Sequence, residues 1–472
     1  MVWATRASAS TTPGRRPSPR ALGGGARAPL VALLVVSALS LGARAYMLGE
    51  PCQSPCTTAG EHTLIFDEAY YVNAARVIAG IRPPAADHYS DAPLGTDPNA
   101  EHPQGAKLIM AAAIELFGDG PFAWRIGSLL MGSIAILGMY ALVRAAGGGA
   151  WQAVGAGALM AADNLLLVHG RIGTLDIYAV AMMVWAVALY LRGRPVWAGV
   201  ALAVGTCFKE LAPYALFALA LLELGRAASA ARAGDRAPPT WRARAALGRL
   251  AATVFVTCGV FVGLLGLMGL IAEPYADAEH RLIAGGPFAE ILHIIRYAAA
   301  LRSPNGPEGI ASYPWQWLID LKPIVYLSVN APAGHVAGAI RPSVLFLGMV
   351  SPPILALGLA SLMLFAWRLL RGRCLGRLPA ALGDVQMMLL ALAWFLGTWT
   401  PYALQSLIDQ RTSYLYYMVV VMPGLYVGAI HLAALAWRGG KRWRWARPLV
   451  GLWWLTVLAA AVVMYPFVAV FL

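Results

Sequence analysis

The chain has 472 residues, of which 59% are hydrophobic and only 12% are charged. An ordinary soluble domain carries roughly 25% charged residues, so this composition excludes a soluble globular protein of this size. It also excludes a disordered chain, which needs low hydrophobicity and high charge. A polytopic helical membrane protein remains, and its net charge of +13 has to be interpreted through the positions of the charges.

Apolar segments that could cross a bilayer recur along the chain, and each crossing takes about 20 residues. Eleven candidates lie at 29–48, 120–143, 150–168, 173–191, 195–208, 211–224, 250–271, 343–367, 385–403, 413–436 and 448–471. The fifth and sixth are short for a crossing. We therefore predict an all-α polytopic membrane protein with about 11 transmembrane helices, in which residues 29–472 form one membrane domain.

The basic residues predict the orientation. With a cytoplasmic N-terminus, the inner segments hold 23 of the 36 Lys and Arg residues, whereas the connection 49–104 holds eight acids against Arg76 and Arg82. The positive-inside rule then places the N-terminus in the cytoplasm and the C-terminus outside a plasma membrane. Residues 1–28, rich in Arg, Ser, Pro and Gly, are expected to be a disordered cytosolic tail. The charge distribution favours contact with the lipid bilayer over a nucleic-acid partner.

Two long outer segments follow from this topology, at 49–119 and 272–342, and long loops in compact proteins are usually functional. The first contains Cys52 and Cys56, for which a local disulfide and two free thiols are both open. Two thiols alone are too few ligands for a structural zinc site. The other cysteines lie in or beside spans and are expected to act as small apolar residues.

Adjacent acids, Asp67 and Glu68, begin a helical pattern in the first long loop. Adjacent carboxylates point to different sides of the chain, so one can act on a substrate while a neighbour holds the other. The apolar residues that follow at helical spacing predict a short helix on the membrane surface. A simple N-cap role for Asp67 is the alternative interpretation.

Further charged residues lie on the same predicted face. His102 is suited to orienting a carboxylate or contacting a sugar, and Lys107 to meeting a phosphate or forming a solvated charge pair. Arg171 and Asp176 lie at the membrane edge, where a charge is costly and is a functional candidate by default. A structural Arg–Asp pair is the alternative for these two.

The remaining candidates follow later in the chain. Lys209 lies between two short spans, which suits either a lipid-phosphate pocket or a snorkelling lysine. Arg411, in a short outer turn, is a second phosphate candidate. Trp315 and Trp317 are suited to stacking on a sugar, and tryptophans at such positions also form the interfacial belt. An interfacial helix is expected at 288–302.

At these residues the sequence resembles the bacterial protein O-mannosyltransferases, members of the C superfamily of lipid-dependent glycosyltransferases. The matching pieces occur in the order of the family and are residues 66–72, 102–108, 122–125, 171–176, the Lys209 turn, 314–318 and Arg411 with Tyr416 and Tyr417. The resemblance implies a fold of eleven spans with an active site on the outer side. It also implies a polyprenyl-phosphate-linked sugar as donor and a Ser or Thr hydroxyl of a secreted or membrane protein as acceptor.

The resemblance implies a mechanism and residue roles. Asp67, with Glu68 beside it, would be catalytic, with Asp67 as the general base on the acceptor hydroxyl, which attacks and inverts the anomeric carbon. Arg171, Lys209 and Arg411 would bind the donor phosphate. The substrate would be oriented by His102, Asp176, Lys107, Trp315 and Trp317. No cofactor is required; a divalent metal is not implied, because the leaving phosphate already carries its charge.

The sequence also departs from the family pattern. Gln104 and Glu210 stand where a proline and an aromatic residue are usual, the usual Gly-Asn-Pro segment is not evident at 331–335, and 272–342 is too short for a β-trefoil domain. These departures leave open the same donor chemistry with a lipid A-like or cell-wall glycan acceptor. A transporter would place its site near the membrane midplane, often within inverted repeats, and no repeat is present. A receptor or scaffold would leave the outer charges without a role.

Overall fold

The computed structural model describes residues 27–232, 239–334, 336–375, 382–439 and 444–468. The predicted tail at 1–28 lies outside the described residues except for its last two. Every statement below concerns the described residues.

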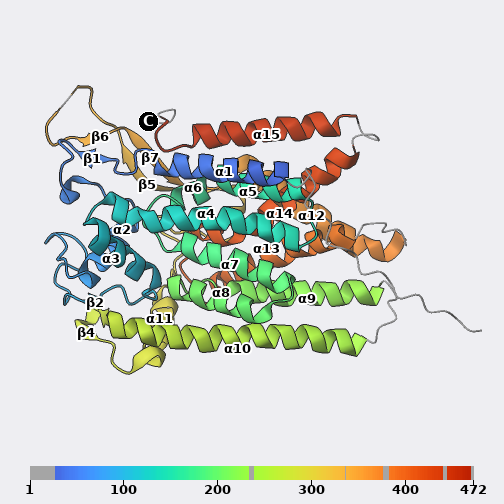
Figure 1. Ribbon diagram of the computed structural model, residues 1–472, viewed down its shortest axis with the longest axis horizontal. Coiled ribbons are helices and arrows are strands. Elements are labelled where there is room, and N and C mark those ends of the chain that lie inside the picture. Colours follow the sequence, from blue (N-terminus) through green and yellow to red (C-terminus); the bar gives the residue numbers. More distant parts are fainter. Residues whose placement is uncertain (1–26, 233–238, 335, 376–381, 440–443, 469–472) are drawn as a thin grey trace, which may run out of the picture.

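Most of the helices run side by side in one bundle, together with the short helix α6 (Figure 1). They are α1 (Arg27–Ala45), α4 (Pro121–Ala145), α5 (Ala150–Ala162), α6 (Asn164–His169), α7 (Asp176–Leu191), α8 (Pro195–Phe208), α9 (Tyr214–Arg232), α10 (Pro239–Ile271), α12 (Pro352–Leu375), α13 (Leu382–Ile408), α14 (Met418–Gly439) and α15 (Ala446–Val463). Seven of the described helices are long and apolar enough to cross a membrane, and α7 and α8 are shorter apolar helices. The predicted helical membrane fold is confirmed, and a helix occupies part of every predicted span. The number of crossings stays a prediction.

Two predicted spans differ from the observed elements. The segment 150–168 is interrupted at Asp163, whose side chain caps α6 by accepting from the Leu165 backbone N–H at 2.9 Å. The segment 343–367 becomes helical only at Pro352, because Val344–Gly348 form strand β7. The alternating burial along this strand, with Phe346 buried, shows that its apolar residues pack inward instead of starting a membrane helix.

The two long loops gather at one end of the bundle (Figure 1). They contain α2 (Glu68–Ile78), α3 (Gly105–Phe117) and α11 (Gly286–Ala300), so helices form where α2 and α11 were predicted. The strands are β1 (Cys52–Gln53), β2 (Thr96–Asp97), β3 (Glu273–Ala276), β4 (Arg281–Leu282), β5 (Ile324–Val329), β6 (Ile340–Arg341) and β7 (Val344–Gly348).

Strand pairing joins the two long loops to each other. β2 pairs in parallel with β3, and β1 pairs antiparallel with β6, so each pair takes one strand from each loop. β5 and β7 form an antiparallel pair with register Ile324 to Gly348. The loops therefore form one structured layer at the end of the bundle.

Close helix contacts fix the helices that carry the site. A Cβ atom at Gly127 of α4 would lie 2.0 Å from the Tyr178 hydroxyl of α7, and one at Gly397 of α13 would lie 2.3 Å from the Ala218 nitrogen of α9. Small residues are common where membrane helices approach this closely. Since α7 begins at Asp176, the contact at Gly127 holds a predicted site residue in place.

Candidate active site

A cavity of about 400 Å³ lies within the layer of loops. Its polar lining includes Asp67, Glu101, His102, Glu210 and Arg411. Most of the remaining lining is aromatic, from Phe66, Tyr70, Tyr71, Tyr89, Tyr297, Tyr414, Tyr416 and Tyr417. The two long loops and the turns after α8 and α13 all contribute, so residues far apart in the sequence meet here.

Asp67 lies at the N-terminus of α2 and lines the cavity. Its half-buried side chain makes no capping hydrogen bond, so the simple N-cap interpretation is wrong. Burial raises the pKa of Asp67 to about 6; nearby Lys209 and His102 lower it and Asp176 raises it. A carboxylate with this pKa is ionised at neutral pH and accepts a proton more readily than an ordinary Asp.

Phe66 sets the direction of Asp67. Its φ of 56° lies in the left-handed region, which is uncommon for a bulky residue and costs of order 1–3 kcal/mol. Its ring stacks on Tyr326 of β5, with ring centroids 4.0 Å apart, and the Tyr326 hydroxyl hydrogen-bonds His169 Nε2 at 2.8 Å. The β5–β7 pair thus compensates for the unusual backbone directly before the candidate base.

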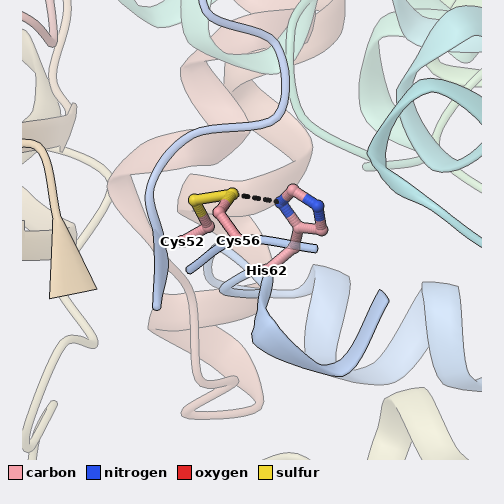
Figure 2. Close-up of side chains that lie close together, drawn as sticks. All are labelled: Cys52, Cys56 and His62. Atoms are coloured by element: carbon pink, nitrogen blue, oxygen red, sulfur yellow. Dashed lines mark hydrogen bonds between the residues drawn. A yellow bond between two sulfur atoms is a disulfide. The ribbon is translucent and has the colours of Figure 1, made fainter. Parts of the chain in front are cut away.

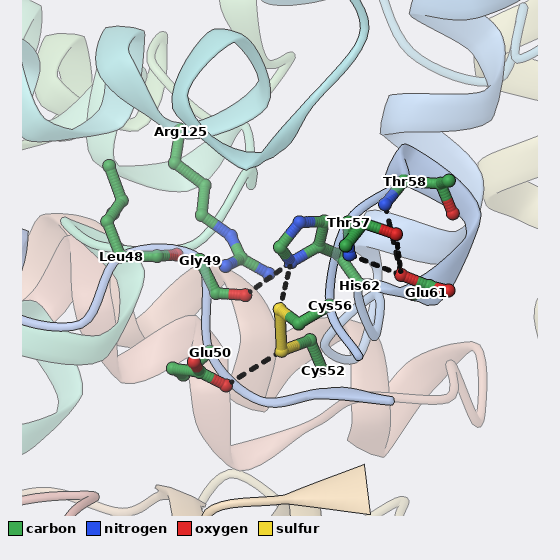
Figure 3. The surroundings of a disulfide bond; sticks show 10 residues. All are labelled: Leu48, Gly49, Glu50, Cys52, Cys56, Thr57, Thr58, Glu61, His62 and Arg125. Atoms are coloured by element: carbon green, nitrogen blue, oxygen red, sulfur yellow. Dashed lines mark hydrogen bonds between the residues drawn. A yellow bond between two sulfur atoms is a disulfide. The ribbon is translucent and has the colours of Figure 1, made fainter. Parts of the chain in front are cut away.

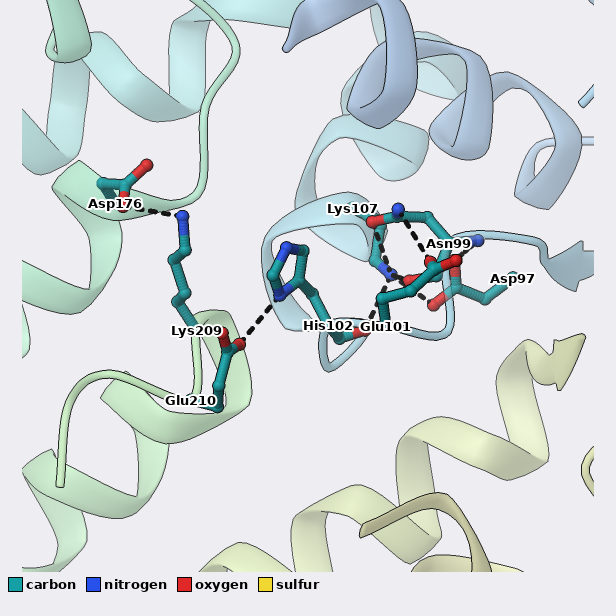
Figure 4. Close-up of polar contacts among 8 residues, drawn as sticks. All are labelled: Asp97, Asn99, Glu101, His102, Lys107, Asp176, Lys209 and Glu210. Atoms are coloured by element: carbon teal, nitrogen blue, oxygen red, sulfur yellow. Dashed lines mark hydrogen bonds and ion pairs between the residues drawn. The ribbon is translucent and has the colours of Figure 1, made fainter. Parts of the chain in front are cut away.

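Lys209 and Asp176 form a buried ion pair (Figure 4), and both are close enough to Asp67 to shift its pKa. Lys209, directly after α8, donates to Asp176 Oδ1 at 2.7 Å, and His169 Nδ1 lies 3.6 Å from Asp176 Oδ2. The ammonium also lies 5.5 Å from the centroid of the Tyr416 ring, which lines the cavity. The structure therefore places a cation just behind the cavity wall, held by an acid.

His102 and Glu210 form a second pair on the cavity wall (Figure 4). His102 Nδ1 and Glu210 Oε2 lie 2.8 Å apart. Burial opposes the charge of Glu210, but His102 and Lys209 outweigh it and keep the pKa of Glu210 below its ordinary value. The departure from the family pattern at Glu210 thus supplies a partner for His102.

Arg411 is the cation that lines the cavity directly. Its Nη1 donates to the Ala298 carbonyl of α11, and its buried Nε has no hydrogen-bond partner. No carboxylate of the described residues lies within ion-pair distance of it. A half-buried guanidinium without a carboxylate partner is a ready partner for a phosphate.

Glu68, which was predicted to be catalytic with Asp67, is not among the residues that line the cavity. Its oxygens accept from Arg125 at 2.8 and 2.7 Å and from the backbone N–H groups of Ile65 and Gly173. The carboxylate is fully buried and all its contacts are structural. Glu68 therefore anchors the start of α2, and a catalytic role for it stays a prediction.

Two predicted cations are likewise engaged elsewhere. Arg171 donates to the carbonyls of Arg44, Tyr46 and Met47 and does not line the cavity. Lys107 is fully buried and pairs with Asp97 Oδ2 at 2.6 Å (Figure 4). In this structure Arg171 fixes the chain after α1 and Lys107 holds the turn before α3, and neither is among the residues that line the cavity.

The tryptophans also lie off the cavity. Trp317 is fully buried and donates to Ser312 Oγ at 2.9 Å, whereas Trp315 is exposed and stacks on Tyr313. The aromatic rings at the cavity come instead mainly from tyrosines, which sequence reasoning did not select. The adjacent Tyr414, Tyr416 and Tyr417 beside Arg411 were the available signal.

Comparisons with known proteins bear on this site. Residues 101–232 match the family model described as dolichyl-phosphate-mannose-protein mannosyltransferase. A polyprenol-phosphate-mannose–protein mannosyltransferase of Corynebacterium glutamicum is 33% identical over 141 residues. The predicted resemblance to protein mannosyltransferases is confirmed. The aligned part spans 29% of this chain and only 26% of that relative, and the family match includes His102 and Lys209 but not Asp67 or Arg411.

Solved structures share the fold over most of the chain. The Saccharomyces cerevisiae protein O-mannosyltransferase Pmt1-Pmt2 complex bound to the sugar donor aligns with a TM-score of 0.66 at 12% identity, covering 93% of this chain and 89% of that one. The oligosaccharyltransferase AglB of Archaeoglobus fulgidus, in complex with an inhibitory peptide and a dolichol-phosphate, aligns with a TM-score of 0.50 at 13% identity. It covers 93% of this chain and 55% of that one. The chain therefore shares the fold of these two membrane glycosyltransferase structures.

Proposed function

We propose that this protein is an integral membrane glycosyltransferase that moves a sugar, mannose by its relatives, from a polyprenyl-phosphate donor to a Ser or Thr hydroxyl. The acceptor is a secreted or membrane protein, and transfer takes place with inversion on the outer face of the plasma membrane, with the N-terminus in the cytoplasm. The observation that carries the proposal is one cavity holding the unpaired carboxylate of Asp67 and the unneutralised guanidinium of Arg411.

The proposed chemistry uses these two groups in turn. Asp67 takes the proton of the acceptor hydroxyl, whose oxygen forms a bond to the anomeric carbon. The bond from that carbon to the phosphate oxygen breaks, and the polyprenyl phosphate leaves with its electron pair. Arg411, with Lys209 behind the wall, stabilises the leaving phosphate. The tyrosine rings supply the apolar walls that suit the faces of a sugar.

Arg411 carries a prediction for donor binding. Arg411→Ala is expected to weaken binding of polyprenyl phosphate by about 10–100-fold, since a hydrogen bond to a charged group is worth about 1.5–3 kcal/mol. Arg411→Lys should recover part of this affinity. The neighbouring Arg302 provides the matched control in Arg302→Ala, because its side chain is exposed and donates to the Ala299 carbonyl, and its backbone bridge to Arg411 does not depend on the side chain. Equal affinity of R411A and wild type for the lipid, measured by native mass spectrometry, would remove Arg411 from the donor site.

The acceptor class is tested directly. Detergent-purified protein is given labelled polyprenyl-phosphate mannose with, in parallel, a Ser/Thr peptide, a lipid A-like glycolipid or a cell-wall glycan. Label on the peptide is expected. Transfer to the glycolipid or glycan alone would keep the donor chemistry and overturn the protein acceptor. If no label is transferred to any of the three acceptors, the proposed activity is contradicted.

A further inference from the structure

Segment 49–63 of the first long loop is closed on itself. The structure joins Cys52 and Cys56 in a disulfide, which decides between the two alternatives left by the sequence (Figure 2). His62 Nδ1 donates to the Gly49 carbonyl at 2.7 Å beside this disulfide (Figure 3). The segment therefore leaves neither a thiol nor that imidazole nitrogen free for a ligand.

A groove of about 540 Å³ lies where α10 meets the layer of loops (Figure 1). Residues within 265–271, the last two turns of α10, form one wall. The facing wall comes from residues 94–96, from β3 and from residues within 283–290. The α10 groove, as we call it, shares no lining residue with the cavity, so it is a separate hollow of the protein.

The α10 side of the groove faces the membrane. α10 is long and apolar enough to span a bilayer, and most of it is not buried within the protein. Leu267, Leu270 and Ile271, in the turns that end at the groove, are all exposed. On a spanning helix, such apolar side chains are covered by lipid chains. The groove therefore lies at the level where the chains of a lipid meet its headgroup.

Glu290 of α11 supplies a buried polar group to the groove. It lines the groove, is 1% exposed, and its Oε1 has no hydrogen-bond partner among the described residues. A buried acceptor without a donor costs free energy, which an N–H group of a ligand would recover. Burial raises the pKa of Glu290 to about 7, and a cation bound beside it would favour the ionised form.

The charges around the groove favour a cationic ligand. Glu273 adds an exposed carboxylate to its lining, and none of the described residues that line it is Lys, Arg or His. Lys107, which lowers the pKa of Glu290, is itself paired with Asp97 Oδ2 at 2.6 Å. A ligand that brings its own positive charge and N–H donors is thus complementary to the groove.

Two glycines of α10 leave room for such a ligand. A Cβ atom at Gly266 would lie 3.6 Å from Pro287, and one at Gly269 would lie 4.0 Å from Pro274. These are ordinary contact distances, so a Cβ atom fits at both positions. A longer side chain would extend into the groove and fill it.

We propose that the α10 groove binds a phospholipid with a primary-amine headgroup, a phosphatidylethanolamine of the leaflet on the side of the loops. Its ammonium group donates to Glu290 Oε1 and is attracted by the carboxylate of Glu273. Its phosphate stays at the open side of the groove in water, and its acyl chains lie along the exposed apolar turns of α10. This binding does not depend on the proposed transfer reaction.

Helix α11 connects the α10 groove with the cavity. Glu290 lies in its first half, whereas Tyr297 and Ala298 near its end line the cavity. The Ala298 carbonyl accepts from Arg411 Nη1. A lipid bound at Glu290 therefore holds the helix that contacts the candidate phosphate ligand.

The test compares lipids that differ only in the headgroup. Full-length protein in detergent is mixed with phosphatidylethanolamine, phosphatidylcholine or phosphatidylglycerol carrying the same acyl chains, and native mass spectrometry measures each affinity. Phosphatidylethanolamine is expected to bind at least about tenfold more tightly, the usual worth of a hydrogen bond to a charged group. Phosphatidylcholine has no N–H group and phosphatidylglycerol has no cation. Equal affinity for all three lipids would overturn the proposal.

Substitutions on the two walls test the location. Glu290→Gln is expected to abolish the preference for phosphatidylethanolamine, whereas Glu308→Gln, at an exposed acid outside the groove, should keep it. Gly269→Leu should weaken binding by filling the groove. Gly259→Leu, on the same helix and with nothing within 4 Å of its Cβ position, is the matched control.

The two variants alter different walls, so either one that folds decides the question. An unchanged preference in E290Q, or unchanged binding in G269L, would place the lipid elsewhere and overturn the proposal. Equal affinity for the three lipids, together with a dimer mass that G269L abolishes, would assign the groove to a second copy of this chain instead.

Discussion

Asp67→Asn is expected to lower kcat for sugar transfer by about 10²–10⁴-fold, the usual contribution of a positioned general base. Binding of the polyprenyl-phosphate donor should persist, because Arg411 and Lys209 are unchanged. The reason is local: the Asp67 carboxylate lines the cavity and has no capping or other hydrogen-bond partner among the described residues. An assay with labelled donor measures the loss, and native mass spectrometry measures the retained binding.

The pH profile gives an independent test of the same residue. The base acts only when deprotonated, and burial raises the pKa of Asp67 to about 6. Activity should therefore be full well above pH 6 and fall as the pH drops through about 6. An Asp with an ordinary pKa near 3.9 would stay active well below that value. Asp91→Asn, at an exposed acid of the same loop, is the matched control. Transfer by D67N at the wild-type rate would refute Asp67 as the base.

Arg125→Met is expected to destabilise the protein by about 3–5 kcal/mol, because it leaves the buried carboxylate of Glu68 without its partner. The two side chains are fully buried and joined at 2.7 Å. Arg125 also donates to the Leu48 and Thr63 carbonyls, which lie on either side of the Cys52–Cys56 disulfide. Thermal unfolding in detergent measures the loss. Arg281→Met, which removes an exposed partner of Glu279, should change stability by only about 0–1 kcal/mol.

Thermal unfolding also distinguishes the structural role of Glu68 from the catalytic role proposed for Asp67. Glu68→Gln should lower the unfolding temperature, since an uncharged amide cannot replace the paired carboxylate beneath Arg125. Asp67→Asn should leave that temperature nearly unchanged, since its side chain has no structural partner. A Glu68→Gln protein that is as stable as wild type but inactive would restore Glu68 to the catalytic centre.

Many residues of the candidate site could be predicted from the sequence, because charged residues are rare in this chain and unevenly distributed along it. The low charge content made Asp67, His102, Lys209 and Arg411 conspicuous, and the charge asymmetry placed them on one face. The structure brings three of these four to the cavity wall and the fourth, Lys209, directly behind it.

The features that the sequence did not predict depend on partners that carry no sequence signal. Arg171 is held by backbone carbonyls of residues 44, 46 and 47, which every residue type provides. Lys107 pairs with Asp97 only because of the turn before α3. The apolar residues of β7 have the composition of a membrane span, and only their pairing with β5 makes them a strand.

A structure of the protein with a polyprenyl-phosphate sugar bound tests the location and chemistry of the site most directly. The phosphate should contact Arg411 near Lys209, and the anomeric carbon should face the Asp67 carboxylate within the tyrosine-lined cavity. A phosphate bound at Arg171 or Lys107, or an anomeric carbon out of reach of Asp67, would contradict the proposed active site.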